Sequence, residues 1–143
     1  MKVKGFNRVE LVVREDEIEK AAAQFNEVLG TRLPRPIAIE GHPVISSTDF
    51  EGSIELVAAP GGEGPFAGRG AGAIGPLVWE VEDIDDARSW LEANGYAIQF
   101  EYDSTQGSAE EASTAVRQLI LDPGQWFGFH VTLMERAETA GRA

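Results

Sequence analysis

The sequence contains no cysteine, only two methionines and few aromatic residues. Without cysteine the chain can form no disulfide, no thiolate metal site and no cysteine nucleophile, which fits a reducing compartment. Lysine and arginine number 12 against 24 aspartates and glutamates, which gives a net charge of −12. Nucleic-acid backbones and anionic membranes attract clustered positive charge, so this balance argues against both classes of partner. The negative net charge would favour a cationic ligand, or would serve only to keep the protein soluble.

Long apolar runs are also missing. No segment approaches the roughly 20 apolar residues of a membrane span, and Met1 leads into strand-like residues without an apolar signal region. We therefore expect a cytoplasmic protein. A length of 143 residues with 43% hydrophobic residues predicts one ordinary globular unit.

One strand–helix unit occurs twice in the chain. In residues 76–95 an alternating strand is followed by the N-cap residue Asp83, an amphipathic helix and a glycine. Residues 8–30 repeat this order, with Asp16 and Glu19 spaced as a capping box. The predicted apolar helix faces are Ile18, Ala21, Ala22, Phe25, Val28 and Leu29 in one copy, and Ile84, Ala87, Trp90 and Leu91 in the other.

Three strand-like segments follow each helix, so the chain divides into two βαβββ modules. The first module is predicted at residues 1–60 and the second at 76–136, joined by a Gly-rich linker at 61–75. Within the second module, residues 103–113 form a predicted mobile polar loop. Residues 137–143 form a small polar tail that we expect to be frayed.

Several strings in this order resemble the glyoxalase, bleomycin-resistance and dioxygenase superfamily, whose fold is called vicinal oxygen chelate. They are Val9-Glu-Leu-Val-Val, Phe25-Asn-Glu-Val-Leu-Gly, Ser53-Ile-Glu-Leu-Val, Trp79-Glu-Val-Glu-Asp-Ile, and Leu121-Asp-Pro followed by Gly128 and Thr132-Leu. The resemblance implies one α+β domain, in which tandem βαβββ modules form a cupped mixed β-sheet with helices outside. It also implies a small-molecule site inside the cup and a symmetric homodimer.

The resemblance places family metal ligands at four positions of this chain, and three of them do not suit a metal. Metal-dependent members draw ligands from the start of each module's first strand, usually histidine, and from a carboxylate in each closing strand. Carried over, these positions are Arg8, Glu55, Pro76 and Thr132. Only Glu55 can ligate a metal well, so no metal or other cofactor is expected. The alternative is a relocated divalent site among Glu10, Glu55, Glu80 and His130.

Strand alternation gives the side chains that face the cup. If Leu11 packs under the first helix, then Arg8 and Glu10 face the other way, and the same parity applies to Glu55 and Glu80. We predict that Arg8 pairs with Glu55 in place of a metal ion. The candidate ligand-binding set is Arg8, Glu10, Glu55, Glu80, Trp126, His130 and Thr132.

Each candidate has a functional and a structural interpretation. In the functional interpretation, Glu10, Glu55 and Glu80 are general acids or bases whose pKa values are raised by crowding. In the structural interpretation, one of these carboxylates pairs with Arg8 and the others are solvated. His130 is a general base or ligand hydrogen-bonder, or a hydrogen-bonded structural histidine. Trp126 stacks on a flat ligand or covers the core.

Three functions follow from these alternatives. The leading hypothesis is metal-independent binding of a small, fairly apolar organic molecule, as sequestration of the antibiotic-resistance type. The second is a lyase, isomerase or dioxygenase, metal-dependent or metal-independent, with Glu10, Glu55, Glu80 and His130 as candidate catalytic residues. The third is a structural or regulatory domain. The sequence leaves open whether the chain is an enzyme and which ligand it binds.

Overall fold

The computed structural model describes residues 1–103 and 116–136. The predicted polar loop, from residue 104 on, and the predicted tail at 137–143 lie outside these residues. The chain packs as two compact units, called here the first and second modules. The first is Arg8–Pro76, and the second combines Met1–Asn7 with the chain from Leu77 on. The first β-strand therefore begins in the second module and ends in the first.

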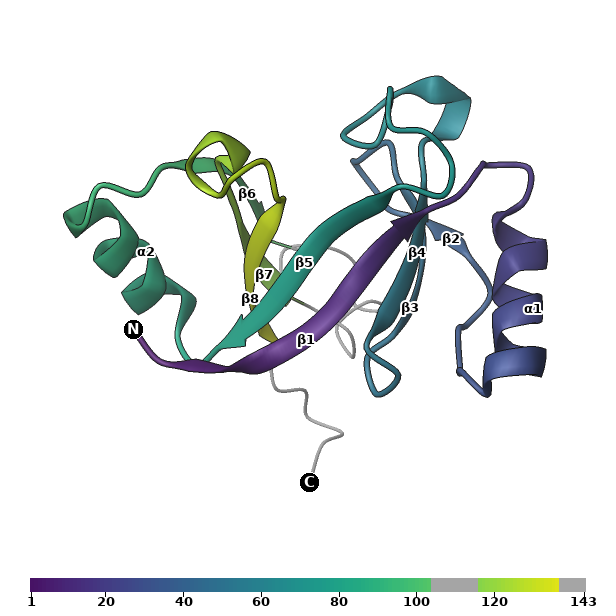
Figure 1. Ribbon diagram of the computed structural model, residues 1–143, viewed down its shortest axis with the longest axis horizontal. Helices are drawn as coiled ribbons and strands as arrows, with labels where there is room; N and C mark the ends of the chain where they lie inside the picture. The colour runs from purple at the N-terminus through teal and green to yellow at the C-terminus, as the bar shows by residue number, and fades with distance from the viewer. Residues whose placement is uncertain (104–115, 137–143) are drawn as a thin grey trace. The chain divides into compact units, whose positions relative to one another are not determined.

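The first module carries one helix and most of four strands (Figure 1). Its elements are β1 (Val3–Val12), α1 (Ile18–Leu29), β2 (Ile37–Ala38), β3 (Ile45–Asp49), β4 (Ile54–Ala58) and the 3-10 turn η1 (Pro60–Gly62). The strand order is β2-β3-β4-β1, with β1 and β4 parallel and the other neighbours antiparallel.

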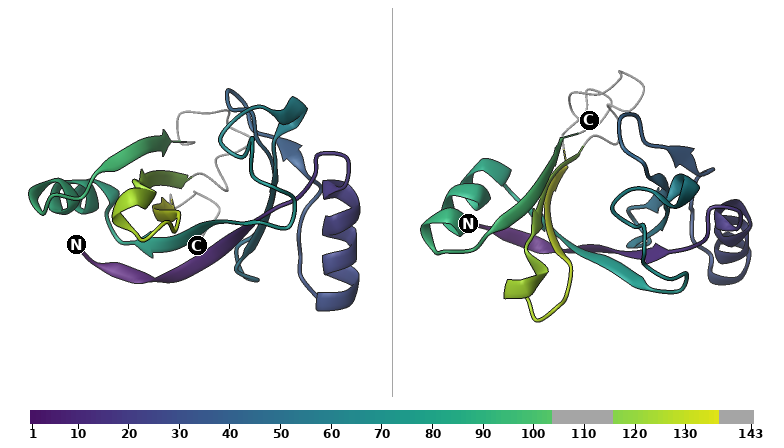
Figure 2. Two further views of the ribbon diagram at one scale, coloured as in Figure 1. Left: turned by 45° about the horizontal axis from the view of Figure 1, so that its top comes forward. Right: turned by 90° about the horizontal axis from the view of Figure 1, so that it is seen from above.

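The second module repeats this topology (Figures 1 and 2). Its elements are β5 (Ile74–Val81), α2 (Ile84–Ala93), β6 (Ile98–Asp103), β7 (Val116–Leu121), the 3-10 turn η4 (Pro123–Gln125) and β8 (Val131–Arg136). β5 and β8 are parallel, and β7 is antiparallel to both β8 and β6. The eight strands share one mixed sheet in the order β2-β3-β4-β1-β5-β8-β7-β6, so the predicted α+β fold of paired βαβββ modules is confirmed.

Each helix covers one face of its own strands, as the alternation predicted. Leu11 and Leu56 belong to the cluster around α1, whereas Val12 and Val57 pack on the opposite face. In the second module Leu133 likewise packs with the residues of α2. Burying such side chains supplies most of the stability of each module, at about 25 cal/mol per Å² of apolar surface removed from water.

The helix ends agree with the sequence only in part. Asp83 caps α2 by accepting hydrogen bonds from the backbone N–H groups of Asp85 and Asp86, and Gly30 ends α1 in the left-handed conformation. The capping box predicted for α1 is wrong, because Glu17 is the N-cap without a side-chain bond and Asp16 accepts from Arg14 instead. Its buried face also ends early: the predicted core residues Val28 and Leu29 are 70% and 65% exposed.

The Gly-rich segment predicted as a linker packs on the first module. Phe66 is buried against Val12 and Val57, on the face that α1 leaves open, and β5 begins at Ile74, within the predicted linker. The Gly-rich segment thus covers one end of the sheet face opposite α1. Within the described part of the chain, no helix is both long enough and apolar enough to cross a membrane.

Candidate functional site

Three charged side chains are buried together on the face of the first module opposite α1. The parallel register of β1 and β4 sets Glu10 beside Glu55, and Arg8 lies two residues earlier on the same face of β1. The Arg8 Nε donates to Glu55 Oε1 at 2.7 Å, and its Nη2 to Glu10 Oε2 at 3.4 Å. The three residues are only 2–7% exposed. The predicted pairing of Arg8 with Glu55 is confirmed.

Arg8 is held as a cation in this site. Burial lowers the pKa of the Arg8 guanidinium, but the charges of Glu55 and Glu10 and the hydrogen bond to Glu55 outweigh burial, so the pKa is raised. The ring of Phe50 also faces the guanidinium, with its centroid 5.3 Å from Cζ. A permanent positive charge therefore occupies the centre of the cluster.

Glu10 differs from Glu55 in its electrostatics. Burial and the nearby charge of Glu55 raise the pKa of Glu10 to about 8, although Arg8 and Arg69 act in the opposite direction. Glu10 is consequently protonated at neutral pH, when its carbonyl oxygen can still accept the longer bond from Arg8. A carboxyl group that titrates near pH 8 can serve as a general acid or base.

Arg69 is a charged neighbour of this cluster that sequence reasoning missed. Burial lowers the pKa of Arg69, and the charge of Glu10 partly offsets this effect. A Cβ added to Gly75 would lie 3.1 Å from the Glu10 backbone oxygen and 3.6 Å from Arg69 Nη1, so a glycine lets the two strands of this region approach. The available signal was a single arginine inside a segment otherwise rich in glycine and alanine.

The remaining predicted site residues belong to the second module. Glu80 forms an ion pair with Lys4 Nζ at 3.1 Å. His130 lies one residue before β8, and its backbone oxygen accepts a hydrogen bond from the backbone N–H of Leu77. Thr132 is buried, and within the described residues its Oγ1 has no hydrogen-bond partner. Trp126 packs against the apolar cluster around α2. This position agrees with the interpretation that Trp126 covers the core.

The residues at the family's metal positions do not fit a metal ion. The only carboxylate among them, Glu55, is bonded to the Arg8 guanidinium, and Pro76 and Thr132 offer at most a hydroxyl oxygen. Across residues 1–103 and 116–136, no three His, Asp or Glu side chains are grouped so that they could hold a metal. We therefore derive no chemistry through a metal ion.

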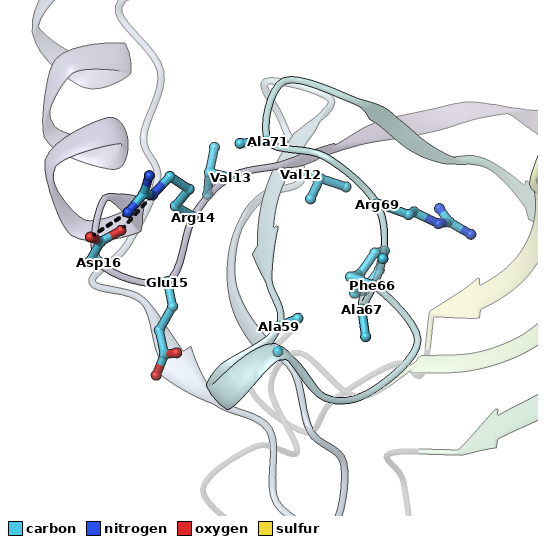
Figure 3. A pocket seen from close by; sticks show the side chains of 12 residues that line it. Val12, Val13, Arg14, Glu15, Asp16, Ala59, Phe66, Ala67, Arg69 and Ala71 are labelled. Atoms are coloured by element: carbon cyan, nitrogen blue, oxygen red, sulfur yellow. Dashed lines mark hydrogen bonds and ion pairs between the residues drawn. The ribbon is translucent and has the colours of Figure 1, made fainter.

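The first module also carries an open surface pocket of about 620 Å³ between the end of β1 and the Gly-rich segment. Its floor is apolar and includes Val12 and Phe66, while Arg14 and Asp16 form an ion pair on its rim (Figure 3). Figure 3 shows the Arg69 guanidinium pointing away from this pocket. The pocket and the buried cluster thus share one face of the module but present different chemistry.

Known proteins resemble the chain in sequence pattern and in fold. Residues 7–116 match a family described as the glyoxalase/bleomycin resistance protein/dioxygenase superfamily. No curated protein matches the sequence.

Solved structures match nearly the whole chain. Methylmalonyl-CoA epimerase from Mycobacterium tuberculosis has a TM-score of 0.75 at 21% identity, covering 99% of this chain and 93% of its own. A hypothetical protein from Bacillus halodurans has a TM-score of 0.75 at 17% identity, with 96% and 97% covered. A variant of methylmalonyl-CoA epimerase from Streptomyces coelicolor, in complex with 2-nitronate-propionyl-CoA, has a TM-score of 0.71 at 11% identity, with 96% and 100% covered. Identities this low indicate a shared fold.

Proposed function

The chain belongs to the glyoxalase/bleomycin resistance protein/dioxygenase superfamily, and from that premise we propose that it binds a small, fairly apolar organic molecule without a metal ion. We infer that the ligand lies on the face of the first module opposite α1, and that it is sequestered in the manner of antibiotic-resistance proteins. The observation that carries this proposal is the Arg8–Glu55 bond of 2.7 Å at two positions of the family's metal ligands.

The surroundings of the ion cluster support an apolar ligand. Val12 and Val57 continue the same face beyond Glu10 and Glu55, and the Gly-rich segment adds Phe66. Organic ligands generally bind in apolar concavities that hold a few polar groups, which fix orientation. The buried cluster supplies such groups, and the apolar residues beside it supply the contact surface.

The proposed function is tested by native mass spectrometry of protein purified without chelators, then mixed with a panel of small organic molecules. The panel includes acyl-CoA thioesters, because an epimerase of similar fold is in complex with one. We expect at least one compound to bind without being converted, and Arg8→Met to abolish its binding. Arg35→Gln is the matched control, since Arg35 is exposed on the surface. Failure of every compound to bind would favour a structural or regulatory domain, and the same spectra report whether the chain is a homodimer.

We also expect the protein to purify with well under one tightly bound transition metal per chain. The physical reason is that the Arg8 cation opposes a second positive charge beside Glu55. Elemental analysis of the chelator-free preparation measures this. A stoichiometric metal that disappears in the Glu55→Ala variant would contradict the expectation and favour the metal-dependent enzymes of the superfamily.

The second candidate function is a metal-independent isomerase or lyase, and Glu10 is the observation that favours it. A buried carboxyl with a pKa of about 8 next to a guanidinium can give or take a proton near neutral pH. Turnover of any panel compound that is lost in Glu10→Gln, with its binding retained, would select this enzyme over sequestration.

A further inference from the structure

We propose that the open pocket at the end of β1 receives a small organic cation, an amine joined to an apolar body, and that Glu15 pairs with its positive charge. The inference rests on the proposed function, because the pocket shares Val12 and Phe66 with the face assigned to the ligand. It narrows that ligand to the class of organic amines, and it adds Glu15 to the residues that determine specificity.

The pocket has the size and the lining of a small-molecule site. Its volume of about 620 Å³ lies within the range of roughly 300–1,000 Å³ that is usual for such sites. Val12 and Phe66 form a buried floor, and small apolar side chains are added by Ala59, Ala67 and Ala71. An apolar body can therefore be removed from water in this pocket.

Hydrogen bonds hold the walls of the pocket in place. The backbone N–H of Gly72 donates to the Val12 oxygen at 2.8 Å, and that of Val12 donates to the Ala73 oxygen at 3.0 Å, so the Gly-rich segment is attached to the end of β1. At the rim, the backbone N–H of Gly61 donates to Glu15 Oε2 at 2.8 Å, which joins η1 to the turn between β1 and α1. A site that is formed before the ligand arrives loses less conformational freedom on binding.

The bond from Gly61 also holds a carboxylate at the rim. Among the residues that the structure describes, none donates a hydrogen bond to the other oxygen of Glu15, Oε1, or forms an ion pair with it. Arg14, its neighbour in the chain, bonds other carboxylates: Nε and Nη2 each donate to Asp16 at 3.1 Å, and Nε lies 3.3 Å from Glu17 Oε1. Glu15 is therefore the rim carboxylate that can pair with a ligand.

The charge around the pocket complements a cation. The turn between β1 and α1, residues 14–17, carries one arginine and three acidic residues, and the whole chain has a net charge of −12. Arg69 also lines the pocket, but its guanidinium points away from it, whereas the Glu15 side chain extends toward η1 (Figure 3). A bound amine would thus meet a carboxylate beside an apolar floor, and an organic acid would be repelled by the same carboxylate.

A proton–nitrogen NMR titration of the full chain tests the inference with matched probes, phenethylamine and naphthylmethylamine against the corresponding uncharged alcohols. We expect at least one amine to shift the backbone signals of the pocket residues. It should bind about threefold to fivefold more tightly than its alcohol at low salt, the effect of one exposed ion pair. Raising the ionic strength to about 0.5 M should weaken this preference.

Three variants locate the effect. Glu15→Gln should abolish the preference for the amine and leave alcohol binding unchanged, because glutamine keeps the length of the side chain and an acceptor for Gly61. Ala67→Trp, at an exposed position of the lining, should fill the pocket and abolish binding of both probes. Glu27→Gln is the matched control, since Glu27 is exposed on α1 outside the pocket, and it should change neither.

The outcomes separate this inference from the proposed function. Equal binding of amine and alcohol overturns the inference, and so does a preference that Glu15→Gln leaves unchanged. Binding by no amine, or signal shifts confined to residues outside the pocket, also overturns it. In each case the proposed function stands if a compound of the mass-spectrometry panel binds, and it fails too if none does. Thermal unfolding of each variant establishes that a lost preference comes from a folded protein.

Discussion

Replacing Arg8 with methionine is expected to lower the free energy of unfolding by about 3 kcal/mol. The variant keeps an unbranched side chain, shorter than that of arginine, and leaves Glu55 buried without its bonded partner. Removing one member of a buried ion pair is strongly destabilising, because the remaining charge has lost both water and its counterion. Urea unfolding of the wild type and the variant, with equal slopes against denaturant, measures the difference.

A double variant separates the contribution of the Arg8–Glu55 bond to stability from the contribution of side-chain packing. Arg8→Met with Glu55→Leu replaces both charges by apolar groups of similar size, and we expect it to cost less than Arg8→Met alone. The two single effects should therefore depart from additivity by at least about 1 kcal/mol. The exposed pair of Arg14 and Asp16 is the control, where the corresponding cycle should be additive within about 0.5 kcal/mol. Additivity at Arg8 and Glu55 would mean that the bond contributes nothing to stability.

The Arg8–Glu55 pair was predictable from strand alternation together with the family resemblance. Alternation along each strand fixes which side chains share a face, and the resemblance places Arg8 and Glu55 at opposed ligand positions of one cup. Alternation acts over a few residues, so it holds before the tertiary structure is known. The parity of Leu11 against Val12 and the left-handed glycine that ends α1 were confirmed for the same reason.

The features that were missed depend on contacts distant in sequence. Arg69 joins the site only because Phe66 anchors the Gly-rich segment on Val12 and Val57, and no periodicity marks such a segment as part of a module. The burial of Val28 was predicted from helix periodicity alone, which gives a face but not the length over which the sheet covers it. The capping box failed because Arg14 competes for the carboxylate of Asp16.

The register between β1 and β4 determines the chemistry of the buried cluster. A parallel pairing that sets Glu10 beside Glu55 brings two carboxylates together in a buried place, and only one of them obtains the short bond from Arg8. Burial and the neighbouring charge of Glu55 raise the pKa of Glu10, which has only the longer bond from Arg8. This difference follows from the position of Arg8, and this position is a property of the folded module.

The protonated Glu10 makes the stability of the protein depend on pH. Its pKa is raised from an ordinary value of 4.5 to about 8, so between these limits the folded chain binds a proton that the unfolded chain has released. The contribution is fully present below pH 4.5 and is lost as the pH rises through 8. We expect the free energy of unfolding to fall with rising pH in this window, with a slope of up to about 1.4 kcal/mol per pH unit from this group.

The Glu10→Gln variant isolates this effect from the other titrating groups. Glutamine has the shape of a protonated glutamate and keeps a hydrogen-bond donor, but it cannot release a proton. The two proteins should differ little near pH 5, and by pH 8 the variant should be more stable than the wild type. Urea unfolding of both proteins from pH 5 to 8.5 gives the difference directly. Parallel curves across this range would show that Glu10 is already ionised at neutral pH, and would remove the acid–base role considered for this carboxyl.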